Sequence, residues 1–227
     1  MAYFPFYMDI SNKVGLVVGG GKIALRKIEV LSQFDAKIIV IAADICEEIY
    51  NLVKTKEKKS DKELAEKSDE ESGETREKIV IVKRRFRDED IAEAEFVIAA
   101  TNDELLNSHI SDLCRQHNIL VNVVDVKEEC SFIFPAIVKK NELVISISTG
   151  GNCPAMAAKI KENIEGIIPY YYGELMELLG ENREYIKKNV NILENRKKVY
   201  SELMQIAETN QENIAEELIH EVVEKYR

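Results

Sequence analysis

Short runs of Val, Ile and Leu recur along the first half of the chain. Five of them are nearly all apolar, as expected of strands buried on both faces, and they lie at residues 14–18, 36–41, 79–82, 96–100 and 119–124. Segments with the apolar spacing of amphipathic helices follow three of these runs, at about 22–34, 44–53 and 105–117. The alternation predicts an α/β fold in which helices cover both faces of a doubly wound parallel sheet.

The second half of the chain has a different pattern. Two further strands are predicted at 131–138 and 143–148, and the residues from Pro154 onward have helical spacing. Near the end of the chain, five apolar residues form a stripe that we expect to be a packing or dimer face: Ile214, Leu218, Ile219, Val222 and Val223.

A charged segment interrupts the first half of the chain. Residues 54–78 are almost all Lys, Glu, Asp and Ser, and their opposite charges nearly cancel. Such a segment buries too little apolar surface to order itself well. We expect a solvated or partly helical insertion and assign it no chemistry.

Composition narrows the class of protein. The 227 residues are 45% hydrophobic and carry a formal net charge of −10, which argues against a nucleic-acid partner. No apolar run approaches the roughly 18 residues of a membrane span. The first residues also lack the basic start of a signal peptide, so we expect a cytoplasmic protein with no membrane partner. The cysteines are scattered without a C-x-x-C pair, which favours structural thiols over a metal site: Cys46, Cys114, Cys130 and Cys153.

The candidate chemistry begins directly after the first strand. Gly19, Gly21 and Ala24 match the pattern G-x-G-x-x-G/A between a predicted strand and a predicted helix. A side chain at Gly19 would obstruct the sharp turn, and one at Gly21 would hold a pyrophosphate away from the backbone. The N–H groups at the start of the helix can then bind phosphates. The motif predicts a nucleotide site, and a purely structural turn is the alternative.

Two more strand ends belong to the same predicted edge of the sheet. A dinucleotide site usually has an acid about 20 residues beyond the glycines, where it binds ribose hydroxyls. Here the second strand ends at Ala42-Ala43, and the nearest acid is Asp44. No arginine stands there to hold a 2′-phosphate, so the sequence favours NAD over NADP. After the fourth strand, Thr101-Asn102-Asp103 either approaches the nucleotide or only caps the next helix.

Asp125 and a second glycine turn complete the candidates. Asp125 follows the fifth strand and emerges at the edge that carries the first glycine turn. A carboxylate there either takes a proton or orients a substrate, or it is an ordinary solvated acid. Residues 148–154 form a further turn, which either binds an anion or starts a helix.

Taken together, these segments resemble the precorrin-2 dehydrogenase / sirohydrochlorin ferrochelatase family, the N-terminal part of siroheme synthases. The matching segments follow the family's order over residues 1 to about 165, and they are 17–27, 98–103, 121–125, 131–136 and 146–151. The resemblance implies a homodimer with three parts: a Rossmann-type domain at 1–125, a small dimerisation region at 126–153 and a C-terminal helical domain at 154–227.

The activity that the resemblance implies is NAD-dependent oxidation of precorrin-2 to sirohydrochlorin, on the way to siroheme or a related tetrapyrrole. NAD would contact the glycine turn and the neighbouring strand ends, at Gly19, Gly20, Gly21, Lys22, Ile23, Ala43, Asp44 and Thr101. The family's essential aspartate falls on Asp125, as the base or as the group that orients the ring. The tetrapyrrole would lie against Asn122, Thr149, Gly150 and Gly151. Because this substrate carries many carboxylates, a basic lining is needed. The residues that either line the site or are ordinary solvated cations are Arg26, Lys27, Lys139, Lys140 and Lys159.

Two alternatives stay open. Some members of the family also insert iron, so Fe2+ is a candidate second substrate, while the sequence predicts no resident metal site. A regulatory module that binds NAD without chemistry is the rival hypothesis. Such modules usually carry the acid directly at the end of the second strand and have no use for Asp125. Cys153 also departs from the family pattern, which has a serine at that position.

Overall fold

A computed structural model describes the backbone of residues 3–66 and 78–227, and the side chains of 3–56 and 78–227. The chain divides into two compact units, an N-terminal unit (Met1–Phe134) and a C-terminal unit (Pro135–Arg227). The N-terminal unit includes residues 126–134, which the resemblance places in the dimerisation region. The role of residues 126–153 in a dimer stays a prediction.

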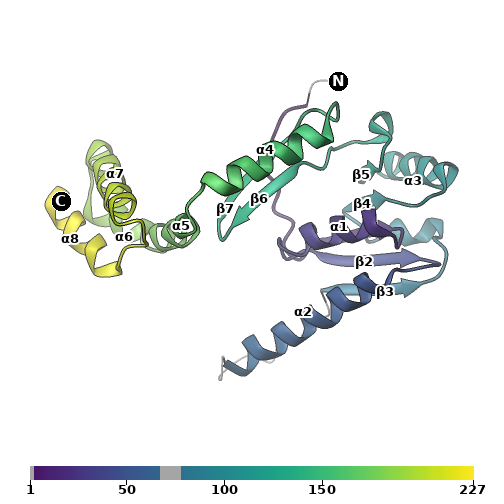
Figure 1. Ribbon diagram of the computed structural model, residues 1–227, viewed down its shortest axis with the longest axis horizontal. Coiled ribbons are helices and arrows are strands. Elements are labelled where there is room, and N and C mark those ends of the chain that lie inside the picture. The colour runs from purple at the N-terminus through teal and green to yellow at the C-terminus, as the bar shows by residue number, and fades with distance from the viewer. Residues whose placement is uncertain (1–2, 67–77) are drawn as a thin grey trace. The chain divides into compact units, whose positions relative to one another are not determined.

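The N-terminal unit is built on a five-stranded sheet (Figure 1). Its strands are β1 (Val14–Val18), β2 (Lys37–Ala42), β3 (Ile79–Lys83), β4 (Phe96–Ala99) and β5 (Leu120–Val123). All neighbours are parallel, and the order is β3-β2-β1-β4-β5. The chain therefore starts in the middle of the sheet, builds to one edge, and returns to the other side of β1. This confirms the predicted parallel, doubly wound arrangement.

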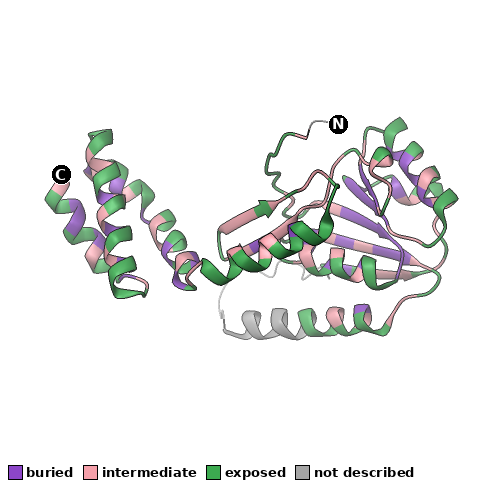
Figure 2. Ribbon diagram, turned by 45° about the horizontal axis from the view of Figure 1, so that its top comes forward, coloured by how far each residue is buried: buried purple, intermediate pink, exposed green. Residues whose placement is uncertain are grey.

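Two apolar cores lie on opposite faces of this sheet because successive side chains of a strand point in opposite directions. Leu16 and Val18 of β1 pack in one core with residues of α3 (Glu104–Gln116). Val17 packs in the other core with residues of α1 (Lys22–Leu31) and α2 (Glu47–Glu66). Figure 2 shows the buried strands between helices whose outer faces are exposed.

The carboxyl ends of four strands are level with one another. Val18 lies opposite both Ile41 and Ala99, and Ala99 lies opposite Val123. The loops after β1, β2, β4 and β5 therefore leave the sheet at one edge. The order of the strands reverses between β1 and β4, which is where open α/β sheets bind their ligands.

Two predicted elements differ in the structure. The helix predicted at 44–53 begins at Glu47 and continues to Glu66, so the first part of the charged segment is helical, as expected, while residues 67–77 lie outside the described residues. The strand predicted at 131–138 is wrong for residues 131–135, since β6 covers Ala136–Lys140. Ser131 instead donates its N–H to the carbonyl of Val121 at 2.8 Å and accepts from the N–H of Val121 at 2.7 Å, which holds this segment along β5.

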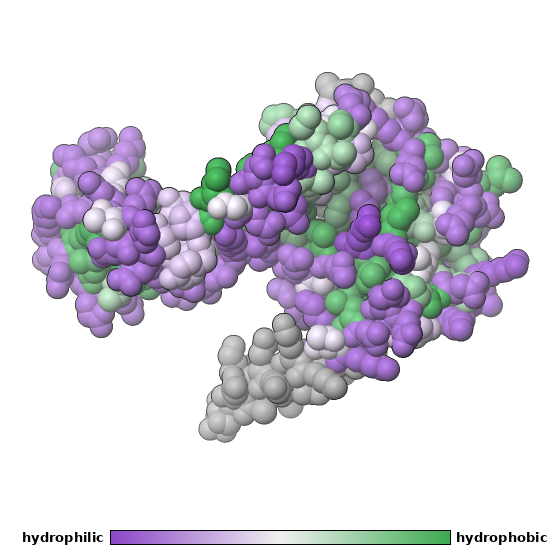
Figure 3. Space-filling model, viewed as in Figure 1, coloured by the Kyte–Doolittle hydropathy of each residue, from purple (hydrophilic) through white to green (hydrophobic). Residues whose placement is uncertain are grey.

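The C-terminal unit combines a hairpin with helices. Strand β6 pairs antiparallel with β7 (Leu143–Ile147), and the helices that follow are α4 (Pro154–Ile167), α5 (Tyr171–Glu181), α6 (Arg183–Asn189), α7 (Leu193–Asn210) and α8 (Glu216–Tyr226). The stripe at the end of the chain is a packing face, because Ile219, Val222 and Val223 are buried against α6 and α7. Figure 3 shows a largely hydrophilic surface over the visible face of these last helices. In the described part of the chain, no helix is both long and apolar enough to cross a membrane.

Candidate functional site

Two glycines in the turn from β1 to α1 are required by their surroundings. Gly19 has a φ of +130°, which L side chains rarely adopt, and a Cβ there would lie 2.2 Å from the carbonyl oxygen of Ala100. A Cβ on Gly20 would lie 2.1 Å from the carbonyl oxygen of Asp44. The turn therefore packs closely against the loops that follow β4 and β2. Sequence reasoning missed the requirement at Gly20, because the carbonyl that causes it belongs to a different loop.

Gly21 differs because the space beside it is empty. It precedes the first turn of α1, and no group of the described residues lies within 4 Å of the position that a Cβ would take. Among the described residues, no side chain caps α1, and its first turn holds no acidic residue. The first N–H groups of a helix have no partner inside the helix, and the helix dipole favours an anion there. This place therefore fits a phosphate or pyrophosphate group.

The loop after β2 lies against the glycine turn. The N–H of Cys46 donates to the carbonyl of Gly20 at 2.8 Å, and Ala43 and Asp44 are both exposed. This contact brings Asp44 beside the turn although β2 ends at Ala42. Its carboxylate is therefore open to a ribose hydroxyl of a bound nucleotide. Lys22 and Ile23, which begin α1, are exposed as well.

Thr101 also lies beside the glycine turn, but its polar groups bond within its own loop. Its hydroxyl donates to Oδ1 of Asn107 at 2.7 Å, and its N–H donates to the same oxygen at 3.2 Å. Nδ2 of Asn107 donates back to the carbonyl of Thr101 at 3.1 Å. Asn107, only 6% exposed, is a residue that sequence reasoning missed; the available signal was an amide on the apolar face of a predicted helix.

Asp103 is the N-cap of α3. Its Oδ1 accepts from the N–H of Leu106 at 3.1 Å, which confirms the capping interpretation for this residue. The turn from β4 to α3 is thus closed by its own side chains, and the N–H, carbonyl and hydroxyl of Thr101 are all engaged with Asn107, so Thr101 offers a ligand mainly its methyl group as a contact surface.

Asp125 lies in a tight turn at the end of β5. The N–H of Val124 donates to the carbonyl of Ala99 at 3.0 Å, and the chain then turns at Asp125 with a φ of +64°. Aspartate is one of the residues that tolerate this left-handed conformation. Because the strand ends are level, the exposed carboxylate lies at the edge that carries the glycine turn.

Lys27 of α1 interacts electrostatically with Asp125. Its ammonium group lies 4.0 Å from the centre of the Phe134 ring. Burial lowers the pKa of Lys27, and the charges of Cys130 and Asp125 oppose that shift. Burial also raises the pKa of the Cys130 thiol, which keeps it neutral at neutral pH. Asp125 is therefore the negative charge that accompanies this half-buried cation.

Asn122 fixes the segment that carries Phe134. Asn122 is 7% exposed, and its Nδ2 donates to the carbonyl of Phe132 at 3.0 Å. Sγ of Cys130 accepts from the N–H of Val123 at 3.2 Å. These bonds hold the chain along β5 and bring the Phe134 ring to Lys27. The amide of Asn122 thus has a structural partner, and the contact with a substrate that the resemblance implies for this residue stays a prediction.

The second glycine turn belongs to the C-terminal unit, between β7 and α4. Gly150 and Gly151 have φ values of +63° and +80°, and the space beside Gly150 is empty within the described residues. Oγ1 of Thr149 accepts from the N–H of Cys153 at 3.2 Å, just before α4 begins. The turn thus starts a helix and leaves exposed backbone at Gly151, while Gly150 is half-buried.

The other basic candidates have partners elsewhere or are open to solvent. Nζ of Lys139 donates to the carbonyl of Asn141 at 2.7 Å, and Nζ of Lys140 to that of Ile168 at 2.6 Å. Lys159 pairs with Glu162 at 2.8 Å, and Arg26 is exposed. Within residues 3–66 and 78–227, no group of three or more His, Cys, Asp or Glu side chains is arranged to hold a metal ion.

Known proteins match both parts of the chain. Residues 6–136 match the sequence model of a family described as "Putative NAD(P)-binding". The chain is 34% identical over 203 residues to the siroheme synthase of Vesicomyosocius okutanii, covering 89% of this chain and 39% of that protein. It is 36% identical over 197 residues to the siroheme synthase of Ruthia magnifica, covering 87% of this chain and 37% of that protein. These matches confirm the resemblance, although the chain spans less than half the length of those relatives.

A solved structure has the same fold over the whole chain. SirC, precorrin-2 dehydrogenase, is similar with a TM-score of 0.67 and 23% identity, covering 99% of this chain and 100% of that one. The likeness confirms the expected combination of a parallel α/β unit with a C-terminal helical region.

Proposed function

The chain belongs to the NAD(P)-binding family whose model it matches, and on this premise we propose that it is an NAD-dependent precorrin-2 dehydrogenase that forms sirohydrochlorin. The observation that carries the proposal is one edge of a parallel sheet with two features. An uncapped helix start there fits a dinucleotide phosphate, and Asp125 presents an exposed carboxylate at the same edge. A regulatory NAD-binding module, the rival hypothesis, has no need of that carboxylate.

The proposed cofactor site uses the backbone more than side chains. The N–H groups at the start of α1, near Gly21, Lys22 and Ile23, would bind the pyrophosphate. Asp44 would accept from the ribose hydroxyls, and Gly19 and Gly20 would keep the turn tight against the neighbouring loops. Thr101, with its hydroxyl engaged, would contribute its methyl group as a wall of the site. NAD, when bound, supplies the acceptor for a hydride.

Asp125 is proposed as the base. Loss of a hydride from precorrin-2 goes with loss of a proton, and an exposed carboxylate at the sheet edge can take it. Lys27 would supply a positive charge at this edge, where a substrate with many carboxylates needs one. Asp125 is held by its backbone turn, and Lys27 is held by the contact of its ammonium group with the Phe134 ring.

The remaining parts of the proposal concern the C-terminal unit and the assembly. The turn Thr149-Gly150-Gly151, with Asn122 supporting the segment after β5, would contact the tetrapyrrole in a cytoplasmic homodimer formed through residues 126–153. The empty space beside Gly150 supports a contact between backbone and ligand at that turn.

The test supplies precorrin-2 and NAD to the purified protein and follows the absorbance of sirohydrochlorin. We expect turnover, and Asp125→Asn should lower it at least 100-fold, as for loss of a general base, with NAD affinity unchanged. Asp112→Asn, an exposed aspartate on α3, is the control and should keep full activity. No absorbance change with the unaltered protein would contradict the dehydrogenase, and turnover by Asp125→Asn would contradict the role of Asp125.

Iron insertion is tested in the same cuvette. Fe2+ is added after sirohydrochlorin has formed, and the spectrum is followed for siroheme. If siroheme forms faster than in a protein-free control, the enzyme also has chelatase activity. If siroheme forms at the same rate as in that control, the activity of the enzyme is limited to dehydrogenation.

A further inference from the structure

A basic cluster follows β3, in a chain whose net charge is −10. It consists of Lys83, Arg84, Arg85 and Arg87. Strand β3 pairs with β2, and Lys83 lies opposite Ala42 in the register. The residues that follow Lys83 therefore leave the sheet next to Ala43 and Asp44, the proposed place of the adenosine ribose.

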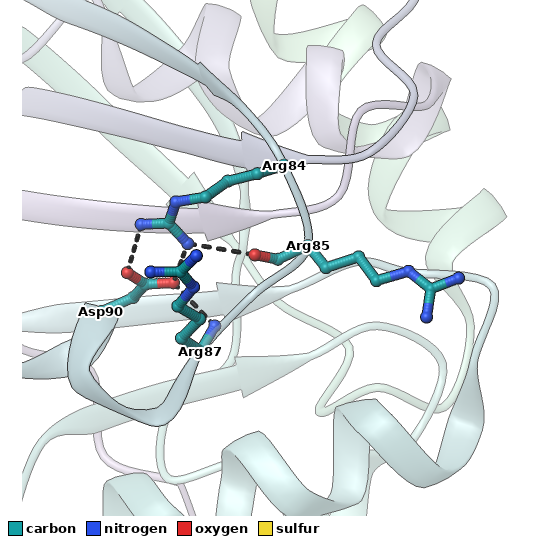
Figure 4. Close-up of polar contacts among 4 residues, drawn as sticks. All are labelled: Arg84, Arg85, Arg87 and Asp90. Atoms are coloured by element: carbon teal, nitrogen blue, oxygen red, sulfur yellow. Dashed lines mark hydrogen bonds and ion pairs between the residues drawn. The ribbon is translucent and has the colours of Figure 1, made fainter.

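Arg84 and Arg87 are engaged with Asp90. Arg84 binds this carboxylate with both of its terminal nitrogens, at 2.7 and 2.6 Å, and Asp90 also accepts from the backbone N–H of Arg87 at 2.8 Å. The Arg84 guanidinium lowers the pKa of Asp90, whose side chain is only 9% exposed. Figure 4 shows the Arg87 guanidinium on the same side, next to that of Arg84. This group has a structural role, since it closes the loop after β3.

Arg85 has a different orientation. Its carbonyl accepts from Arg84 at 3.0 Å, so its backbone is held by the group around Asp90. Its side chain extends away from that group (Figure 4) and is exposed. Within the described residues, no carboxylate forms an ion pair with Arg85 or with Lys83. Among the residues that the structure describes, these two cations thus have no acidic partner. The strand register places their segment next to the loop that carries Asp44, and the Arg84–Asp90 pair holds its backbone in place.

We propose that Arg85, assisted by Lys83, forms a subsite for the 2′-phosphate of NADP, so that the protein accepts NADP as well as NAD. A guanidinium fork matches the oxygens of a phosphate, and an arginine near the end of β2 is the usual device for this group. The sequence around Ala42-Ala43 contains no such arginine, but pairing of β3 with β2 supplies one from the neighbouring strand. With NAD, the carboxylate of Asp44 accepts a hydrogen bond from the 2′-hydroxyl of the ribose. With NADP, a phosphate stands in place of that hydroxyl, and Arg85 offsets the negative charge of Asp44.

The inference rests on the dinucleotide site of the proposed function, and its test needs no tetrapyrrole. Calorimetric titration of the 227-residue chain with NAD and with NADP measures both dissociation constants. We expect the two constants to lie within about tenfold of each other. Arg85→Ala should weaken NADP about tenfold or more, the size expected for one charged hydrogen bond, and change NAD less than about twofold.

Arg87→Ala is the matched control, because it removes the same charge two residues away on a side chain that faces Asp90. It should leave the NADP to NAD ratio unchanged, and thermal melting checks that both variants are folded. The inference is overturned if the unaltered protein binds NAD but not NADP, if Arg85→Ala weakens both equally, or if Arg87→Ala has the same effect. Failure to bind either nucleotide would contradict the proposed function as well.

Discussion

Two turns at one edge of the sheet have the same local architecture and opposite polar chemistry. In the turn from β1 to α1, the helix starts without a capping side chain and the space beside Gly21 is empty. In the turn from β4 to α3, Asp103 caps the helix and Asn107 binds Thr101 through three hydrogen bonds. One helix start is thus left available for an anion, while the other is satisfied by its own side chains.

The two turns depend on each other through one contact. The carbonyl of Ala100, in the closed turn, lies where a Cβ of Gly19, in the open turn, would be. The closed turn therefore acts as a rigid wall against which the open turn folds. In this molecule the binding turn is therefore stabilised from outside, by a neighbouring turn that Asn107 and Asp103 close with their own hydrogen bonds.

Gly19→Ala should break this contact and have the largest effect. The added Cβ clashes with the Ala100 carbonyl at a φ of +130°, so we expect a loss of about 3 kcal/mol or more in the free energy of unfolding. Denaturant titration measures it. Gly166→Ala in α4 is the control, since its Cβ meets nothing within 4 Å, and it should be neutral or stabilising by about 0.5–1 kcal/mol. A Gly19→Ala protein as stable as the original would refute the contact.

Asn107→Ala should open the closed turn. It leaves the N–H and the carbonyl of Thr101 without partners in a half-buried site, at an expected cost of about 2 kcal/mol. Urea unfolding is the measurement. The neighbouring Asn102→Ala, at an exposed position, should change stability by less than about 0.5 kcal/mol. Equal effects of the two variants would mean that Asn107 does not hold the turn.

Gly21→Ala should separate binding from stability at the open turn. Because the Cβ enters empty space, we expect the free energy of unfolding to change by only about a few tenths of a kcal/mol. The same methyl group stands where the pyrophosphate would approach, so NAD affinity should fall about tenfold or more, or about 1.4 kcal/mol. Unchanged NAD binding in this variant would show that the open turn is not the phosphate site.

Lys27→Met, on the helix that starts at the open turn, should have the smallest effect on stability. Burial lowers the pKa of Lys27 in the folded protein below the ordinary lysine value of 10.5, so at pH values below 10.5 the unfolded chain binds more protons at this site than the folded protein does. The contribution of Lys27 to the free energy of unfolding therefore rises as pH increases toward 10.5, and it is smaller at neutral pH than at pH 10.5. At neutral pH, Lys27→Met removes the cost of burying a charged ammonium group, which favours the variant. It also loses the contact with Phe134, about 0.5–1 kcal/mol, which favours the original protein.

The readout for Lys27→Met is the stability difference between the variant and the original protein, measured by chemical unfolding at pH 7 and at pH 10. The difference should move in favour of the original protein as pH rises. A difference that is the same at both values would mean that Lys27 is fully solvated in the fold.

Most of the fold was predictable because it depends on local pattern. Each strand of the parallel sheet shows as an apolar run, and the glycines after β1 mark the turn. The segment at 131–135 was mistaken for a strand because it is apolar, but Ser131 and Asn122 bind it to β5 by side-chain hydrogen bonds instead. Local pattern does not record such bonds, since their two ends are about ten residues apart and their partners are not fixed by periodicity.

The sequence alone determined the order of elements, the positions of Gly19, Asp44 and Asp125 at one edge of the sheet, and the resemblance to a dehydrogenase family. The order of elements and the shared edge follow from residue type and spacing, since a glycine or an apolar run restricts its own backbone wherever the chain is placed. The resemblance depends on the matching segments and their order along the chain. Only the tertiary structure decided that Gly20 faces Asp44, that Asn107 satisfies Thr101, and that Arg85 stands beside the end of β2. Each of these depends on which strands are neighbours, because pairing brings together groups that are far apart along the chain.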